Sequence, residues 1–380
     1  MIFRTRLRGV VSTTVLVSLA LTGTTRAEVP APVMSDQQYA HIAPYLPRFG
    51  RDRPVIAIVG DNAGTELTDL FIPYGVLTRS GAAQVLTVAT QSGPLKMLPA
   101  LTTQPDATLA EFDQRFPDGA DYVIVPAVRD STNAALVAWV AAQGARGATI
   151  VSICDGALVV ANAGLMKGRH ATAHWASQGF RRKTHPEVMW VKNVRYVVDG
   201  KVISSAGISA SMPTALALVE AIAGHDAAQA EAHDLGVADW SDTHNTEPFE
   251  PRLGRNLLPL IAVNFTNGWF HTPDTIGIPV SDGFDEIALG FTADAWSRTG
   301  LSHAYSVAAT VRPLRSIGGL TLLPDQVDGR GDAPDTTLPA LSSEPSMQAL
   351  DQALETIALR YGRGNAYGVA LDLEYPGFHR

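Results

Sequence analysis

The sequence has little cysteine and few basic residues, and both shortages narrow its class. Cys154 is the single cysteine among 380 residues, which excludes an internal disulfide and a zinc site built from several thiolates. Lysine and arginine number 29 against 37 acidic residues, and no basic run extends beyond Arg181–Lys183. We therefore expect no direct nucleic-acid partner, because such proteins present a basic face to the phosphates.

Periodic and low-complexity segments are absent as well. The 33 glycines and 24 prolines are scattered along the chain, which excludes a collagen-like or proline-rich fibrous protein. Hydrophobic residues make up 46% of the chain and charged residues 17%. This composition supplies a folded core and does not fit a disordered tail.

The N-terminal segment 1–27 has the features of an export signal. Arg4, Arg6 and Arg8 precede a short apolar stretch, Val10–Leu21, and Thr25–Ala27 supplies small residues for cleavage. The stretch is shorter than the ~20 apolar residues that span a bilayer. We predict a signal peptide over 1–27 and an exported protein, periplasmic or secreted, with no stable membrane span after processing. An uncleaved N-terminal anchor is the alternative.

From residue 53 onward, short apolar runs alternate with helical segments. Val55–Val59 is a continuous apolar run typical of a strand buried on both faces of a parallel sheet. Strands separated by single helices favour an α/β fold, a three-layer α/β/α sandwich with a mostly parallel sheet. The expected strands are Val55–Val59, Val85–Ala89, Tyr122–Pro126 and Thr149–Ile153, and the expected helices are Thr68–Ser80, Ala134–Gln143 and Ala157–Ala163.

A later segment repeats the start of this domain in a constant register without a gap, so that Gly64 falls on Gly283. The other identical pairs are Leu70/Leu289, Arg79/Arg298, Gly81/Gly300, Val88/Val307, Ala89/Ala308, Pro94/Pro313, Leu95/Leu314, Leu101/Leu320, Thr102/Thr321, Pro105/Pro324 and Asp106/Asp325. So many identities in one register exceed what chance supplies and indicate an internal repeat. The second copy is degenerate and truncated, because it lacks the segment that carries Cys154 and has Ala288 in place of Asp69.

These observations divide the chain into five predicted parts. They are a signal peptide over 1–27, an N-terminal lead segment over 28–52, the cysteine-bearing domain over 53–236, a linker with a bridging helix over 237–273, and the truncated second copy over 274–380. A predicted helix over Met347–Tyr361 in the second copy loosely resembles Met212–Gly224 near the end of the first domain.

Cys154 ends an apolar strand and is followed by Asp155, Gly156 and a helical segment. A strand, a tight turn and a helix with a nucleophile at the corner form a nucleophile elbow. Backbone N–H groups at the start of the helix stabilise a thiolate and hold a developing oxyanion. A buried cysteine that acts as a small hydrophobic residue has the same local pattern, so the spacing alone leaves its function open.

The segment from Ser152 to Trp175, SICDGALVVANAGLMKGRHATAHW, resembles the ThiJ/PfpI family of the class I glutamine amidotransferase-like superfamily. In particular, it is similar to the amidotransferase-like domain of AraC-type regulators, in which an Ala-Gly-Leu-Leu-x-Gly-Arg-x-Ala-Thr-x-His-Trp pattern follows the elbow. DGKVISSAGISAS from Asp199 and ELTDLFIP from Glu66 resemble two further family segments. The resemblance covers residues 53–224 and, more weakly, 274–380, and it implies a flavodoxin-like fold.

Carried over residue by residue, the resemblance implies a site with Cys154 as nucleophile, His174 as a nearby acid or base and Asp69 as the carboxyl group that contacts the sulfur. A protonated carboxyl group beside a thiolate donates a hydrogen bond and lowers the thiol pKa. Asp155 and Gly156 would form the elbow and the oxyanion turn. Asp155 departs from the small residues common after the family's cysteine, and its carboxylate opposes thiolate formation unless it points away. Without the resemblance, Asp69 fits a solvated helix face equally well and His174 fits a structural histidine.

The implied chemistry is addition of Cys154 to an electrophilic carbon of a small molecule, followed by hydrolysis or hydration. Peptidases, deglycase or glyoxalase-type enzymes and isocyanide hydratases occur in the family, and the motifs do not choose among them. The alternative is a non-catalytic ligand-binding or redox-sensing module, so enzyme status stays open. We expect no cofactor and no metal, because His170 and His174 lack a third ligand at a recognised interval. The second copy is expected to act as a built-in partner in a monomeric pseudo-dimer, with a homodimer as the alternative.

Overall fold

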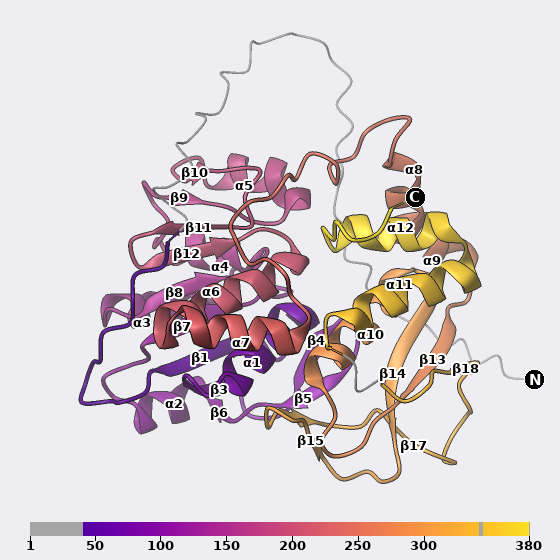
Figure 1. The fold of residues 1–380 in the computed structure, drawn as a ribbon, viewed down its shortest axis with the longest axis horizontal. Helices are drawn as coiled ribbons and strands as arrows, with labels where there is room; N and C mark the ends of the chain where they lie inside the picture. Colours follow the sequence, from indigo (N-terminus) through magenta and orange to yellow (C-terminus); the bar gives the residue numbers. More distant parts are fainter. Residues whose placement is uncertain (1–40, 342–344, 380) are drawn as a thin grey trace, which may run out of the picture. The chain divides into compact units, whose positions relative to one another are not determined.

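A computed structural model describes residues 41–341 and 345–379 of the chain (Figure 1). The predicted signal peptide and most of the predicted lead segment, up to residue 40, lie outside these residues. Within the described ranges, no helix has both the length and the apolar character needed to cross a membrane.

The main sheet has seven strands in the order β11-β12-β8-β7-β1-β3-β6 (Figure 1). Their bounds are β1 Val55–Gly60, β3 Gln84–Ala89, β6 Ala107–Thr108, β7 Tyr122–Val125, β8 Thr149–Ser152, β11 Tyr196–Asp199 and β12 Val202–Ser205. Neighbouring strands pair in parallel except β11, which runs antiparallel to β12. The predicted, mostly parallel sheet is therefore confirmed.

Two hydrophobic cores flank this sheet, as the alternation along β1 shows. Ile56 and Ile58 belong to one core, and Val55, Ala57 and Val59 belong to the other. The first core includes α1 Leu67–Arg79, α6 Ser211–Ala223 and α7 His225–Leu235, and the second includes α2 Leu109–Arg115, α3 Ala134–Ala145 and α4 Gly156–Asn162. A strand covered on both faces needs apolar residues at every position, which the sequence of β1 supplies. The predicted three-layer α/β/α sandwich is confirmed.

Residues 274–379, called the second half below, build a smaller sheet with the order β17-β14-β13-β18, all parallel. Its strands are β13 Asp274–Pro279, β14 Ser302–Ala308, β17 Gln326–Val327 and β18 Thr336–Thr337, and its helices are α10 Glu286–Arg298, α11 Gln348–Tyr361 and α12 Arg363–Asp372. The order β13, α10, β14 follows the same sequence of elements as β1, α1, β3. The domain boundaries derived from the sequence stay a prediction.

A third sheet joins the first domain to the second half. It has the order β15-β16-β5-β4-β2, with β15 Leu314–Arg315 and β16 Thr321–Leu322 from the second half and β5 Thr102–Gln104, β4 Leu95–Leu98 and β2 Thr65–Glu66 from the first domain. The remaining elements are β9 His170–Ala171, β10 Met189–Trp190, the 3-10 turns Trp175–Ser177 and Ile208–Ala210, α5 Gln178–Thr184, α8 Leu257–Ile261, the π-helical turn Ala262–Thr266 and α9 Asn267–Phe270. The third sheet shows that both copies of the predicted repeat contribute strands to one element.

Candidate active site

Cys154 lies at the corner between β8 and α4 with a backbone φ of 54°. A positive φ is uncommon outside glycine, and a strained turn of this kind points a nucleophile away from the strand. Gly156 makes the turn possible, because a Cβ atom there would lie 1.9 Å from the carbonyl oxygen of Val125. The backbone N–H of Cys154 donates to Ser205 Oγ at 3.4 Å, and the cysteine is 6% exposed. The local sequence therefore builds an elbow whose thiol is covered.

Asp69 is fully buried on α1 and carries a polar atom without a partner. Its Oδ2 accepts a hydrogen bond from the Ala127 N–H at 3.0 Å, whereas its Oδ1 has no hydrogen-bond partner among the described residues. Burial raises the pKa of Asp69 to about 8, and the Ala127 N–H opposes this rise. The carboxyl group is therefore mainly protonated at neutral pH, with Oδ1 available to donate or accept a proton.

The thiol of Cys154 has a pKa well above the usual value in this resting arrangement. Burial is the main cause, followed by the negative charges that Asp69, Asp155 and Glu66 would carry. The backbone N–H of Asp155 opposes the rise by favouring the thiolate. Protonation of Asp69 removes one of these charges, so the proton on Asp69 and the proton on Cys154 are linked.

His174 has both ring nitrogens occupied. Its Nε2 lies 2.9 Å from the carbonyl oxygen of Asp372 and donates to it, and its Nδ1 accepts from the Ala176 N–H at 3.3 Å. These two contacts fit the tautomer that carries its proton on Nε2. Because Nε2 carries the proton in this arrangement, His174 can take up another only at Nδ1, and this requires its contact with the Ala176 N–H to break. The role of His174 as an acid or base stays a prediction.

Asp155, the departure from the family pattern, is turned toward a buried arginine. Its Oδ1 accepts from Ser177 Oγ at 2.6 Å, and Arg181 donates to the same hydroxyl at 3.0 Å. Arg181 is 2% exposed and lies over the ring of Trp190, with 5.2 Å between the guanidinium carbon and the ring centroid. Burial lowers the pKa of Arg181 to about 10, and the charge of Asp155 opposes this. Asp155 and Arg181 therefore balance each other next to the thiol.

Asp155→Asn is expected to lower the pKa of the Cys154 thiol, because the substitution removes a nearby negative charge and keeps the side-chain shape. The measurement is the rate of alkylation by iodoacetamide against pH, and the profile should move to lower pH. The exposed Asp118→Asn on the surface is the matched control and should leave the profile in place. An unchanged profile in Asp155→Asn would remove Asp155 from the electrostatics of the site.

The end of α12 and the turn after it cover this site from the second half. The indole N–H of Trp175 donates to the Leu371 carbonyl at 3.2 Å, and the backbone N–H of Ser209 donates to the Leu373 carbonyl at 3.1 Å. Glu374, 1% exposed, accepts from the Gly207 N–H at 2.7 Å on Oε2. Its Oε1 lies 3.0 Å from Nε2 of His244, which donates to it. None of these contacts has a short-range sequence signal, so the sequence alone does not predict them.

Arg298 links this cover to α1. Its guanidinium contacts three carboxylates, namely Asp294 at 2.5 Å, Asp372 at 2.6 Å and Glu66. Thr68 donates to Asp294 at 3.0 Å, so α1, α10 and the end of α12 meet at one buried cluster. Burial raises the pKa of Glu66, and Arg298 opposes this. In the part of the chain that is described, no group of three or more His, Cys, Asp or Glu side chains is arranged to hold a metal ion.

Comparison with known proteins finds relatives that match parts of the chain. An isonitrile hydratase of Pseudomonas putida is 30% identical over 165 residues, which are 42% of this chain and 69% of the hydratase. The HTH-type transcriptional regulator CdhR of Pseudomonas aeruginosa is 35% identical over 85 residues, which are 22% of this chain and 25% of the regulator. The crystal structure of a DJ-1 superfamily protein from Salmonella typhimurium is 26% identical with a TM-score of 0.44, covering 49% of this chain and 100% of that one.

The sandwich and the cysteine at its β8–α4 corner define an α/β/α protein with a cysteine at a strand–turn–helix corner. The profile of the DJ-1/PfpI family matches residues 55–221, a range that contains Asp69, Cys154 and His174. The chain belongs to the DJ-1/PfpI family, as the motifs around Cys154 predict under the name ThiJ/PfpI. The matched range ends before the second half.

Proposed function

We propose that this protein is an exported, cysteine-dependent enzyme that adds water to a small electrophilic carbon, with an isonitrile as the leading substrate class. The observation that carries the proposal is the buried Oδ1 of Asp69, which has no partner among the described residues and lies in the field of the Cys154 thiol. A positioned carboxyl group of this kind moves the proton that a thiol addition requires. The similarity to an isonitrile hydratase supports the substrate class. Hydrolase and glyoxalase-type reactions use the same first step.

In the reactive state, Asp69 and Cys154 hold one proton between them, so that Asp69 is protonated when Cys154 is a thiolate. Sγ of Cys154 attacks the terminal carbon of R–N≡C as the thiolate, and Asp69 delivers the proton to that carbon, giving a thioimidate, R–N=CH–S–Cys. Water then adds to the same carbon, with its proton going to nitrogen. The C–S bond breaks, R–NH–CHO leaves, and the proton of the new carbonyl group returns to the Asp69–Cys154 pair. The sum is one isonitrile and one water consumed for one N-substituted formamide.

The experiment is turnover of a substrate panel that contains benzyl isonitrile, methylglyoxal and a short peptide. We expect N-benzylformamide from benzyl isonitrile, detected by liquid chromatography, and a loss of about 1,000-fold or more in Cys154→Ser. Turnover of methylglyoxal or of the peptide, but not of the isonitrile, would support a cysteine-dependent enzyme and reject the isonitrile as its substrate. Equal turnover by Cys154→Ser, or no turnover of any panel member, would reject the enzyme.

A non-catalytic ligand-binding or redox-sensing module is the second candidate function. The 6% exposure of Cys154 and the occupied nitrogens of His174 favour it, because a resting site so covered admits a small oxidant more readily than a larger substrate. The similarity to a segment of the regulator CdhR points the same way. Stoichiometric oxidation of Cys154 by hydrogen peroxide, together with no turnover of the panel, would support this module over the enzyme.

Export is part of the proposal and rests on the sequence of segment 1–27. The mass of the protein recovered from the periplasm of a bacterial host tests it, since a mature chain should begin at or near residue 28. Recovery of the uncleaved chain from the cytosol alone would contradict export.

We further propose that the second half replaces the partner of a dimer. Two ion pairs support this, and each joins the residue just before one of the helices α1 and α10 to the last residue of the other. In the register of the internal repeat, Glu66 corresponds to Asp285 and Arg79 corresponds to Arg298. Both crosswise pairs are present, Glu66 with Arg298 and Asp285 with Arg79 at 2.6 Å. Such crossing, in which residue i meets j′ and residue j meets i′, is typical of an isologous two-fold interface.

The third sheet repeats this crossing. Thr102 corresponds to Thr321 and Gln104 corresponds to Leu323 in the same register. Thr321 pairs with Gln104, and the N–H of Leu323 donates to the Thr102 carbonyl at 2.9 Å. The pairing is centred on Thr103 and its equivalent, Leu322. A local two-fold relation between the copies explains both the ion pairs and this register.

This architecture predicts a monomer in solution. The surface that a second copy would cover is already covered by α10 and β16 of the same chain. Sedimentation equilibrium should therefore return the mass of one chain, at most 40.4 kDa for the unprocessed protein. A tight homodimer that Arg79→Glu dissociates would contradict the proposal, because it would place α1 in contact between chains.

A further inference from the structure

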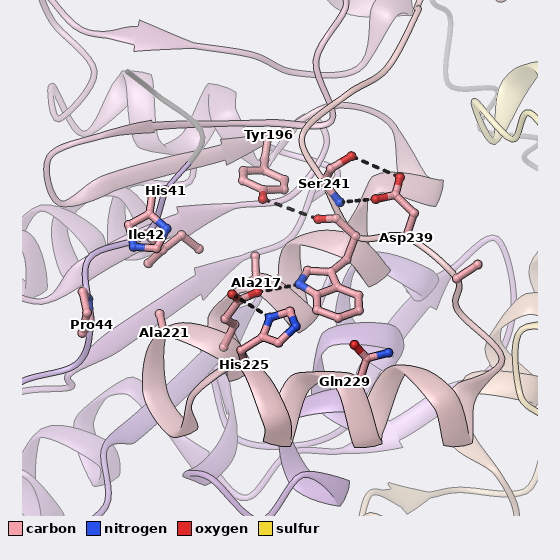
Figure 2. Close-up of a pocket in the computed structure, with 13 residues that line it drawn as sticks. His41, Ile42, Pro44, Tyr196, Ala217, Ala221, His225, Gln229, Asp239 and Ser241 are labelled. Carbon is pink, nitrogen blue, oxygen red and sulfur yellow. Dashed lines mark hydrogen bonds and ion pairs between the residues drawn. The ribbon is translucent and has the colours of Figure 1, made fainter. Parts of the chain in front are cut away.

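A cavity of about 430 Å³ lies away from Cys154, where α6 and α7 meet the loop 238–241 and the segment 41–44 (Figure 2). None of Asp69, Cys154 and His174 lines it. Its volume falls in the range of about 300–1,000 Å³ that small-molecule sites occupy. The cavity therefore has room for a ligand that the proposed reaction does not use.

Glu220 of α6 lines this cavity, and two hydrogen bonds hold its carboxylate in place. The indole N–H of Trp240 donates to Oε2 at 2.7 Å, and Nδ1 of His225 lies 3.1 Å from Oε1 (Figure 2). Burial raises the pKa of Glu220, but these hydrogen bonds outweigh burial and hold the pKa below its usual range. Each carboxylate oxygen accepts one bond and keeps a further lone pair for a ligand.

The charge around the cavity is negative. In the described ranges, the side chains bound to the Glu220 carboxylate are His225 and Trp240, and neither is a lysine or arginine. Arg195, the residue before Tyr196 in the chain, is already paired with Asp239 at 2.8 Å. Burial is the main cause that raises the pKa of Tyr196, and the charges of Asp242, Glu220 and Asp239 raise it further. The charge of Arg195 lowers it. Among the described residues, the lining contains two carboxylates, Glu220 and Asp239, two histidines, His41 and His225, and no lysine or arginine. Carboxylates without a lysine or arginine beside them favour a cation over an anion.

Aromatic and small side chains form the rest of the lining. Trp240 and Tyr196 line the cavity. Ala217 and Ala221 of α6 line it as well, and their short side chains leave space above the helix (Figure 2). The imidazole of His225 lies against Trp240 with 5.6 Å between ring centroids, which fixes the indole in place. An aromatic wall beside a fixed carboxylate is the combination that recognises an ammonium group carried on an apolar body.

We propose that this cavity binds an organic ammonium ion, a primary amine with a small apolar body. Its N–H groups donate to the free lone pairs of Glu220, and its body lies against Trp240 and the two alanines of α6. The site is independent of the Cys154 chemistry, so it stands whether or not the protein proves to be a hydratase.

Calorimetric titration of the full mature chain with two probes of nearly equal shape tests the site. Benzylamine carries the ammonium group, and benzyl alcohol replaces it with a neutral hydroxyl. We expect saturable binding of benzylamine with a Kd below about 1 mM and binding of benzyl alcohol at least about tenfold weaker. Glu220→Gln keeps an acceptor for Trp240 but removes the charge, and it should weaken benzylamine binding at least about tenfold without changing the binding of benzyl alcohol.

The control variant is Glu355→Gln, which removes an exposed carboxylate on α11 and should bind benzylamine as the wild type does. Trp240→Phe gives a second reading, because it removes the indole donor that fixes Glu220 and should also weaken benzylamine binding. Circular dichroism confirms that each variant is folded. Equal affinity for both probes, equal affinity in Glu220→Gln, or no saturable binding of benzylamine up to about 10 mM would overturn the proposal.

Discussion

Replacing Arg298 with methionine is expected to destabilise the protein by about 3–5 kcal/mol at pH 7, because three carboxylates would lose their shared cation. Asp294 is fully covered, and the side chains of Glu66 and Asp372 are each 16% exposed. Unpaired carboxylates in such surroundings must take up protons or draw in water, and both cost free energy. Urea denaturation measures the loss.

The matched control for Arg298→Met is Arg312→Met. Arg312 also pairs with an aspartate, Asp282, but its side chain is 64% exposed, and exposed pairs contribute about 0–1 kcal/mol. Because Glu66 and Asp294 have raised pKa values when folded, they bind protons before the unfolded chain does, and the loss in Arg298→Met should shrink as pH falls. Similar losses in the two variants, or a loss that grows toward acid pH, would show that Arg298 does not hold the cluster together.

The parts of the fold that the sequence predicts well are those with local patterns. The β1 run is apolar at every position because both faces are covered, and the turn at Cys154 needs Gly156 directly after Asp155. Both features depend only on a few neighbouring residues. The α/β/α sandwich and the elbow position follow from them without knowledge of any distant contact.

The contacts that the sequence does not predict join residues far apart in the chain. Glu374 reaches Gly207 across 167 positions, and Arg298 reaches Glu66 across 232. Arg181 belongs to the longest basic run of the sequence, and a basic run of this kind is usually expected on the surface. In the structure Arg181 is buried, and its positive charge offsets the negative charge of Asp155. Periodicity carries no information on such pairs, because they are fixed by how the second half packs on the first domain. The predicted internal repeat is the exception, since its register alone relates the residues of the crosswise pairs to one another.

Asp69→Asn is expected to separate stability from function. The amide oxygen can still accept the Ala127 N–H, so the local geometry is kept, but the side chain no longer exchanges a proton with Cys154. Turnover of the best panel substrate should fall by about 10²–10⁴-fold, the usual contribution of a positioned acid or base. Wild-type turnover should rise with pH toward about 8, where Asp69 and Cys154 come to share one proton.

The same substitution should make the protein more stable at neutral pH. The pKa of Asp69 is about 8 when folded against 3.8 for the free side chain, so the folded state holds a proton that the unfolded chain has released. Wild-type stability from this group is therefore full below about pH 4 and is lost as pH rises to about 8, an effect on the order of 4 kcal/mol at pH 7. Asp69→Asn lacks this loss, so the difference in unfolding free energy between the two proteins should widen as pH rises from 4 to 8. Urea denaturation at each pH measures this difference. The exposed Asp118→Asn should follow the wild type. A constant gap would mean that Asp69 is ionised when folded, and its Oδ1 would then have no proton to deliver to the substrate carbon.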